Sequence, residues 1–305
     1  MKGVGEERRG LLLGLAAWVM WGFFPLYWPL LEPAGAVEIL AHRIVWSMVL
    51  MLGVVLALRK GALRATFADR RTRWLLTLAS VLISVNWGTY IWGVNNQHVV
   101  EASLGYFINP LVSVLLGVLV LGERLRRLQW VALGIAAVAV VALTVEYGHP
   151  PWVALVLAFS FGSYGLAKKK ANAGAVESLV LETLVVSPVA IGYIVFLMVT
   201  GASTFGSNGG WHVVLVIGTG LITVIPLLCF GGAATRIPLS TLGLMQYLTP
   251  SVQFVLGVVV FDEPMPPMRL AGFALIWVSL ALFTFETLRH HRRQLRPRSA
   301  AEVPA

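Results

Sequence analysis

The stretch ASLGYFINPLVSVLLGVLVLGE, residues 102–123, decides how this chain is organised. It is an apolar run long enough to cross a bilayer as a helix, and Pro110 lies in its middle. A related stretch, TLGLMQYLTPSVQFVLGVVVFDE, follows at residues 241–263. A shift of 140 positions places Pro110 on Pro250 and aligns the glutamates that end both stretches, without a gap. The sequence therefore indicates one membrane module that occurs twice.

The composition is that of a membrane protein. Of the 305 residues, 58% are hydrophobic and only 12% are charged, whereas a soluble globular chain carries roughly a quarter charged residues. The single cysteine, Cys229, excludes an intramolecular disulfide and lies in an apolar run, where a free cysteine packs as a small hydrophobic residue. We expect the lipid bilayer to be the solvent of most of the chain.

Apolar runs of about 20 residues are long enough to span the hydrocarbon as helices. Helices are expected because a single helix satisfies its own backbone hydrogen bonds in lipid. The linkers between the runs are short, so no soluble domain is expected. The sequence predicts an all-α integral membrane protein with ten transmembrane helices, at residues 10–31, 37–58, 74–94, 99–121, 128–146, 151–168, 178–200, 211–233, 239–261 and 269–288.

The basic residues set the orientation. Alternating spans place 21 of the 23 Lys and Arg residues on one side of the bilayer; the exceptions are Arg43, within a span, and Arg269, at a helix edge. The positive-inside rule then puts both termini in the cytoplasm. The formal charge of +9 is therefore a topology signal and a contact for anionic lipid headgroups, and no nucleic-acid partner is expected.

Each half holds five predicted spans, so the second half enters the membrane from the opposite side. The expected organisation is a cytoplasmic N-terminus (1–9), two inverted five-helix repeats (10–146 and 150–288) and an unordered basic cytoplasmic tail (289–305). Inverted repeats are typical of secondary transporters, whose substrate site lies between the repeats near the midplane.

Several segments resemble the EamA family of the drug/metabolite transporter superfamily. The resemblance covers the chain up to about Leu288. It implies ten helices, a central cavity lined mainly by the third, fourth, eighth and ninth of them, and export of small metabolites or drugs across a bacterial inner membrane. It does not imply a particular substrate. The matching segments are AHRIVWS (41–47), NWGTYIWGVNNQHVVEASLGYFINPLVSVLLG (86–117), LGERLRRLQW (121–130), TVIPLLCF (223–230) and TRIPLSTLGLMQYLTP (235–250).

Pro110 and Pro250 occupy matching positions in the two repeats. Proline inside a helix removes a hydrogen bond to the carbonyl four residues earlier, which here belongs to Tyr106 and to Gln246. Such carbonyls need another partner or a wet cavity. The two prolines are therefore candidates for hinges beside the cavity; the alternative is a pair of passive kinks that fit the packing.

Polar and aromatic side chains gather on three predicted spans. A site for a small amphipathic molecule needs apolar and aromatic walls with a few fixed polar groups. The alternative role for these side chains is hydrogen bonding between helices. Trp18 and Trp21 fit an interface belt or packing better. The cavity candidates are Asn86, Trp87, Tyr90, Ser103, Tyr106, Asn109, Gln246, Tyr247 and Gln253.

Ionisable residues inside spans are costly and therefore candidates for function: His42, Arg43, Glu101 and Glu182. Arg43 is expected to supply positive charge to a vestibule on the outer side of the membrane, or to form an ion pair with Glu38 or Glu101. The predicted topology places these two glutamates on the same face as Arg43. A direct pair with Glu182 is disfavoured, because the two residues enter from opposite faces. A contact between Arg43 and substrate would favour a carboxylate-bearing metabolite. His42, Glu101 and Glu182 are the candidates for proton coupling.

Motifs for catalysis are missing from the sequence. It contains no G-x-x-x-x-G-K-[ST] phosphate loop and no Cys/His cluster with metal-ligand spacing. We therefore expect a transporter of a small-molecule substrate without a cofactor or metal, rather than an enzyme. The alternative is a membrane-embedded enzyme or lipid-handling protein that uses the same central cavity.

Overall fold

The computed structural model describes residues 2–58, 69–122, 125–171, 173, 175–234, 236–237 and 245–295. Within these ranges the regular secondary structure is entirely helical. Its elements are α1 (Lys2–Gly22), η1 (Phe24–Leu26), η2 (Trp28–Leu31), α2 (Ala36–Leu58), α4 (Arg70–Asn95), α5 (Val99–Leu121), α6 (Arg127–Tyr147), α7 (Trp152–Ala171), α8 (Ala175–Val199), α9 (Gly209–Ala234), α11 (Leu248–Val259) and α12 (Pro267–Leu295).

Most of these helices can cross a membrane. In the described part of the chain, seven are long and apolar enough by length and composition, and an eighth span results if α1 and the following 3-10 turns, which bend by 41°, are taken together. Trp152–Lys168 of α7 and Leu248–Val259 of α11 are apolar but shorter. The chain is therefore a multi-pass membrane protein.

Local sequence signals explain where several helices begin and end. The carboxylate of Asp69 accepts a hydrogen bond of 2.9 Å from the amide of Thr72 and so caps the beginning of α4. Gly122 ends α5 with φ +68° and Gly148 ends α6 with φ +72°, a left-handed conformation that glycine adopts without strain.

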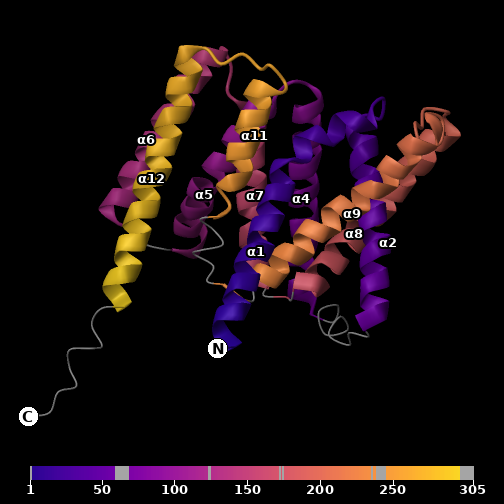
Figure 1. Cartoon of the computed structure of the whole chain (residues 1–305), viewed down its shortest axis with the longest axis horizontal. Coiled ribbons are helices and arrows are strands. Elements are labelled where there is room, and N and C mark those ends of the chain that lie inside the picture. The colour runs from indigo at the N-terminus through magenta and orange to yellow at the C-terminus, as the bar shows by residue number, and fades with distance from the viewer. Residues whose placement is uncertain are drawn as a thin grey trace, which may run out of the picture.

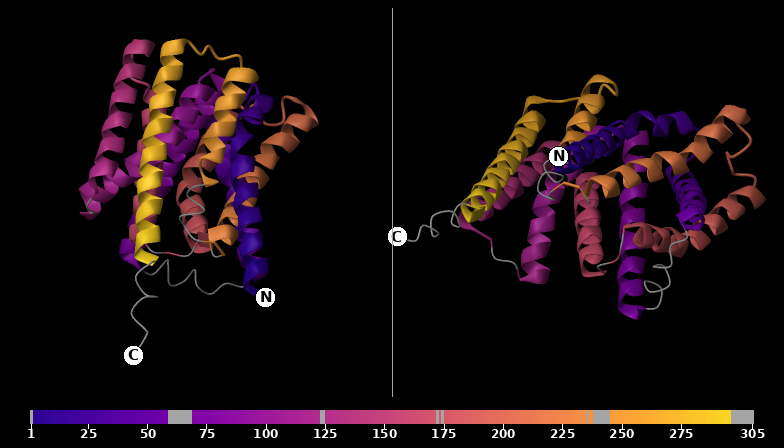
Figure 2. Two further views of the ribbon diagram at one scale, coloured as in Figure 1. Left: turned by 60° about the vertical axis from the view of Figure 1, so that its left-hand side comes forward. Right: turned by 60° about the horizontal axis from the view of Figure 1, so that its bottom comes forward.

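The two halves of the chain interlock rather than fold side by side (Figure 1). α1 packs against α9 and α11, α2 against α8 and α9, α4 against α7 and α8, and α5 against α7 and α11. α6 and α12 pack against each other at one edge of the bundle, as both views in Figure 2 show. The beginning of α1 and the end of α12 lie at the same end of the molecule (Figure 1).

Glycines allow close contact between the halves. A Cβ atom on Gly105 of α5 would lie 2.7 Å from the carbonyl oxygen and 2.9 Å from the Cα of Ala154 in α7. A Cβ atom on Gly220 of α9 would lie 2.7 Å from the carbonyl carbon of Trp46 in α2. Backbone cannot yield as a flexible side chain can, so these helix pairs depend on glycine at both positions.

The outside of the bundle is apolar. Val141 and Val145 on α6 are 63% and 72% exposed, and Val189 and Val199 on α8 are 73% and 82% exposed. Water would solvate such a surface poorly, whereas lipid chains match it. The exposed valines therefore fit contact with a bilayer.

Two sequence predictions about the helices need correction, and a third lies partly outside the described residues. Pro250 is not in a helix interior, because α11 begins at Leu248 and Pro250 lies in its first turn, where proline is tolerated. The predicted unordered tail begins too early, since α12 continues to Leu295. Glu123 and residues 239–244 of the ninth predicted span lie outside the described residues.

Candidate functional site

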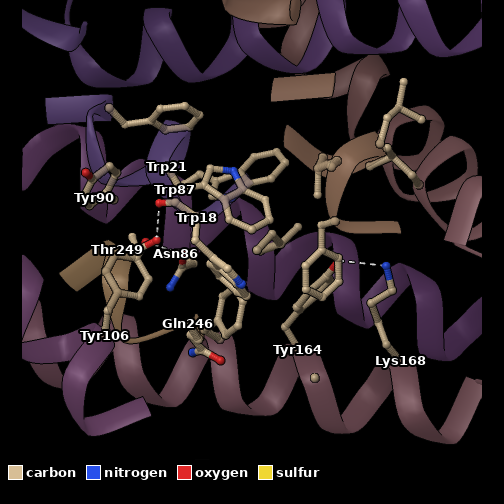
Figure 3. Close-up of a pocket in the computed structure, with 18 of the residues that line it drawn as sticks. Trp18, Trp21, Asn86, Trp87, Tyr90, Tyr106, Tyr164, Lys168, Gln246 and Thr249 are labelled. Atoms are coloured by element: carbon tan, nitrogen blue, oxygen red, sulfur yellow. Dashed lines mark hydrogen bonds between the residues drawn. The ribbon is translucent and has the colours of Figure 1, made fainter. Parts of the chain in front are cut away.

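A cavity of about 780 Å³ lies between the two halves of the chain. α1, α2, α4 and α5 border it from the first half, and α7, α8, α9 and α11 from the second. The expected lining by the third, fourth, eighth and ninth helices is therefore too narrow. Figure 3 shows three tryptophans, Trp18, Trp21 and Trp87, between Tyr90 on one side and Lys168 on the other.

The cavity reaches one end of the bundle. Val176 and Glu177 in the first turn of α8, Lys168 in the last turn of α7 and Gly232 in the last turn of α9 all border it. The beginning of α1 lies at the same end, where its Glu6 forms an ion pair of 2.9 Å with Arg236, two residues beyond the end of α9.

Arg43 is the most unusual group in the wall. Its side chain is 3% exposed, and its Nε donates a 2.8 Å hydrogen bond to the hydroxyl of Thr223. The guanidinium carbon lies 4.0 Å from the ring centroid of Trp87, 5.2 Å from that of Trp28 and 5.6 Å from that of Phe24. Among the described residues, Nη1 has no hydrogen-bond partner. Arg43 thus brings positive charge into an aromatic environment.

The carboxylates expected to pair with Arg43 have other partners. Glu38 accepts a 2.8 Å hydrogen bond from the amide of Thr204, and Glu101 accepts one of 2.9 Å from the amide of Val153. Across the described residues, no carboxylate forms an ion pair with Arg43. The expected Arg43–Glu38 and Arg43–Glu101 pairs are therefore wrong in this structure.

Two hydrogen-bonded pairs hold the tyrosines of the wall. Gln253 of α11 donates through Nε2 to the hydroxyl of Tyr90, at 2.8 Å. The hydroxyl of Tyr106 donates to Oδ1 of Asn86 at 3.2 Å, and the amide nitrogen of Asn86 donates to Oγ of Ser160 at 3.0 Å. Cavity lining and hydrogen bonding between helices, which sequence reasoning treated as alternatives, therefore occur in the same side chains.

A second polar cluster lies toward the end of the bundle that the cavity reaches. Lys168 lines the cavity, and its ammonium group lies 3.0 Å from Oε1 of Glu182 and 2.9 Å from the hydroxyl of Tyr164. Ser178 donates to Oε1 of Glu182 at 2.6 Å, and the hydroxyl of Tyr164 donates to Oε2 at 3.1 Å. Glu182 does not pair with Arg43, as its position in the sequence predicts.

The structure divides the predicted site residues into two groups. Those in the cavity wall are Asn86, Trp87, Tyr90, Tyr106, Gln246, Gln253, Pro250 and Arg43. Those absent from it are Ser103, Asn109, Tyr247, Pro110, His42, Glu101 and Glu182.

The second group makes other contacts. Ser103 donates a 2.7 Å hydrogen bond back to the carbonyl of Val100, and Tyr247 packs on the apolar cluster of α5, α6 and α12. The ring of His42 stacks on Phe205, with 4.9 Å between centroids.

Sequence reasoning missed part of the aromatic wall. Trp18 and Trp21, predicted to lie in an interface belt or in packing, border the cavity, as do Phe161, Tyr164 and Lys168 of α7. The last three positions are three and four residues apart, so they share one helix face. That spacing is a signal in the sequence that could have identified α7 as part of the wall.

With the fold and cavity described, the chain can be compared with known proteins. The profile of the EamA-like transporter family matches residues 8–145 and 151–285. The chain belongs to the EamA-like transporter family. The family profile therefore matches the chain twice, once in each half.

Curated relatives of the EamA-like family extend over the whole chain. Protein RarD of Streptomyces exfoliatus is 57% identical over 305 residues, covering 100% of this chain and 96% of the relative. The uncharacterized transporter YojE of Bacillus subtilis is 44% identical, with coverage of 94% and 97%. The chloramphenicol-sensitive protein RarD of Pseudomonas aeruginosa is 31% identical, also with coverage of 94% and 97%.

A solved structure shares the fold. It is described only as the crystal structure of a protein, and it superimposes with a TM-score of 0.59 at 18% identity, covering 90% of this chain and 97% of the other. At this identity the likeness concerns the fold alone.

Proposed function

We propose that this protein is a secondary transporter that exports a small amphipathic metabolite or drug through the central cavity by alternating access. It does so in a bacterial inner membrane, with ten spans in two inverted five-helix repeats and with both termini in the cytoplasm. The observation that carries the proposal is the large aromatic cavity between the two halves of an EamA-like chain.

Helix packing supports the inverted repeat. The repeat pairs α1 with α7, α2 with α8, α4 with α9, α5 with α11 and α6 with α12. α1 packs on α9 and α11 as α7 packs on α4 and α5, and α2 packs on α9 as α8 packs on α4. If each helix is replaced by its counterpart in the other half, this set of contacts stays the same. Such symmetry is expected of two repeats related by a pseudo-two-fold axis.

Alternating access requires a cavity that is open to one side at a time. The cavity reaches the end of the bundle that holds the first turn of α8, while buried carboxylates join the helices at the other end. This asymmetry supports a conformation that faces the end bearing the N-terminus, which the distribution of basic residues assigns to the cytoplasm. The coupling residue in this proposal is Glu182, the only one of the three candidates that contacts a charged cavity residue, Lys168.

Sealed proteoliposomes test the transport proposal. A thermal-shift screen of the purified protein, with chloramphenicol among amino acids, organic acids and nucleosides, selects the compound to be tested. A ligand at about 100 times its Kd should stabilise the folded protein by roughly 2.7 kcal/mol. The expected result is saturable flux of the stabilising compound across the sealed vesicles.

Pro110→Ala examines the proposed hinge. It is expected to lower flux more than it lowers the yield of folded protein, because Pro110 lies inside α5. Pro188→Ala is the matched control and is expected to have the smaller effect, since Pro188 also lies inside a helix, α8, and outside the cavity wall, but is exposed. Unchanged flux in Pro110→Ala would remove the hinge from the proposal.

The same preparation separates the alternatives. Chemical conversion of the compound in open detergent would favour a membrane-embedded enzyme. Binding without flux in sealed vesicles would favour a lipid-handling protein or a receptor.

A further inference from the structure

Arg43 is a buried cation for which the described part of the chain supplies no carboxylate. Its Nη1 has no hydrogen-bond partner, although the side chain is only 3% exposed and forms part of the cavity wall. Removing a guanidinium from water is costly unless an anion and further hydrogen bonds compensate it. The rings of Trp87, Trp28 and Phe24 supply attraction but no net negative charge.

Arg269 shows what a completed arginine site looks like in the same molecule. Its guanidinium carbon lies 4.2 Å from the ring centroid of Tyr147, much as Arg43 lies over Trp87. Unlike Arg43, it also forms a two-point contact with Glu146, with nitrogen–oxygen distances of 3.0 and 3.2 Å. Both arginines stack on an aromatic ring, and only Arg269 has an acid partner.

The missing partner must reach Arg43 through the cavity. The other lysine or arginine in the described wall, Lys168, is already neutralised by Glu182 at 3.0 Å. An incoming anion therefore finds its strongest attraction at Arg43. A carboxylate fits best, because a guanidinium presents its donors in a planar fork that matches two carboxylate oxygens.

We propose that Arg43 binds the carboxylate of the transported compound, and that the substrate class is amphipathic monocarboxylates with a flat aromatic or apolar body. The body packs against Trp87, Trp21 and Tyr106, which stand in the same wall. This inference rests on the proposed function and names the substrate class of that site. Arg43 has no carboxylate partner among the described residues, so one bound monoanion balances its charge.

Matched acid and amide probes have nearly the same shape, so a difference in their binding reports the negative charge of the acid. Phenylacetate, indole-3-acetate and 2-naphthoate are each compared with their primary amides, by thermal shift and by tryptophan fluorescence of the purified protein. At least one acid is expected to bind ten or more times more tightly than its amide. Arg43→Gln is expected to abolish this ratio, and Arg43→Lys to keep part of it, because lysine retains the charge but not the fork.

The control variant is Arg269→Gln, which removes a stacked arginine outside the cavity wall. It is expected to leave the acid-to-amide ratio unchanged. Structural damage alone would weaken acid and amide together and leave their ratio constant, so the ratio separates recognition from folding.

Three results would overturn the inference. The first is a panel in which no acid binds better than its amide. The second is a preference for the acid that survives in Arg43→Gln. The third is competition by phosphatidylglycerol that depends on Arg43, which would assign the site to a lipid headgroup. Saturable flux of chloramphenicol, a neutral compound, found together with any of these three results would preserve the transport proposal while removing the anion site.

Discussion

At the scale of single residues, three glutamates share an uncommon role. Glu38, Glu101 and Glu263 are 4%, 3% and 7% exposed, and each accepts hydrogen bonds from backbone amides of another segment. Glu263 binds the amides of Val99 and Val100 in the first turn of α5. Such amides lack partners within their own helix and carry partial positive charge, so a carboxylate there is compensated without a cation.

Glu263 lies between α11 and α12 and is expected to make stability depend on pH. Burial raises the pKa of Glu263 from its ordinary value of 4.5, against the opposing effects of the Val100 and Val99 amides, His98 and Arg269. Because the folded pKa is raised, the stabilising contribution of this group is fully present below 4.5 and is lost as pH rises through the folded pKa. The melting temperature of the wild type, relative to that of Glu263→Gln, should therefore fall as pH rises above 4.5. A difference that stays constant as pH rises would contradict the prediction.

Several cavity residues could be predicted from the sequence, and the reason is chemical. Asn86, Tyr106 and Gln253 are polar or amphipathic groups within apolar runs, where they need a partner or a cavity. Lys168 was not predicted as a cavity residue, because a lysine near the end of a span resembles the other basic residues that set the topology. The partner of Glu101 could not be predicted either, since the backbone amide of Val153 carries no signature in the sequence.

At the scale of helices, a run of apolar residues predicts that a helix is present better than it predicts where that helix begins, ends or bends. The predicted runs 37–58 and 99–121 agree closely with α2, Ala36–Leu58, and α5, Val99–Leu121. The predicted run 239–261 corresponds in the described residues to the shorter α11, because hydropathy reports which residues avoid water and not where the backbone turns. Polar side chains at such a turn can face the cavity, as Gln246 does.

The contact between α5 and α7 provides a test of helix packing. In Gly105→Ala the added Cβ would lie 2.7 Å from the carbonyl oxygen of Ala154, so the helices must separate, and the free energy of unfolding should fall by about 1–3 kcal/mol. Gly134→Ala on α6 is the matched control: no atom lies within 4 Å of its added Cβ, and removing a helical glycine should stabilise by about 0.5–1 kcal/mol. Both changes can be measured by unfolding in mixed detergent micelles. Equal effects of the two substitutions would show that helix propensity, not close packing, governs these positions.

At the scale of the whole molecule, the predicted orientation can be tested by labelling. In a Cys229→Ser background, cysteines replace Ser207, exposed in the connection after α8, or Lys170, exposed at the end of α7. An impermeant maleimide is expected to label Ser207→Cys in intact cells and Lys170→Cys only after permeabilisation, because the positive-inside rule assigns the basic side to the cytoplasm. The reverse pattern would invert the topology, and labelling of both in intact cells would refute the predicted number of spans between them.

The glutamates that join α5 and α7 to their neighbours also determine what opening that end of the molecule would require. An apolar seal would expose hydrocarbon surface to water each time it parted, at a cost proportional to the area uncovered. A seal of carboxylates and helix-end amides behaves differently, because water can replace either partner and the net change is about 1.5–3 kcal/mol per hydrogen bond to a charged group. Such a closure can part and re-form at a cost set by a few hydrogen bonds, and the arrival of water to solvate the carboxylates becomes the event that releases it.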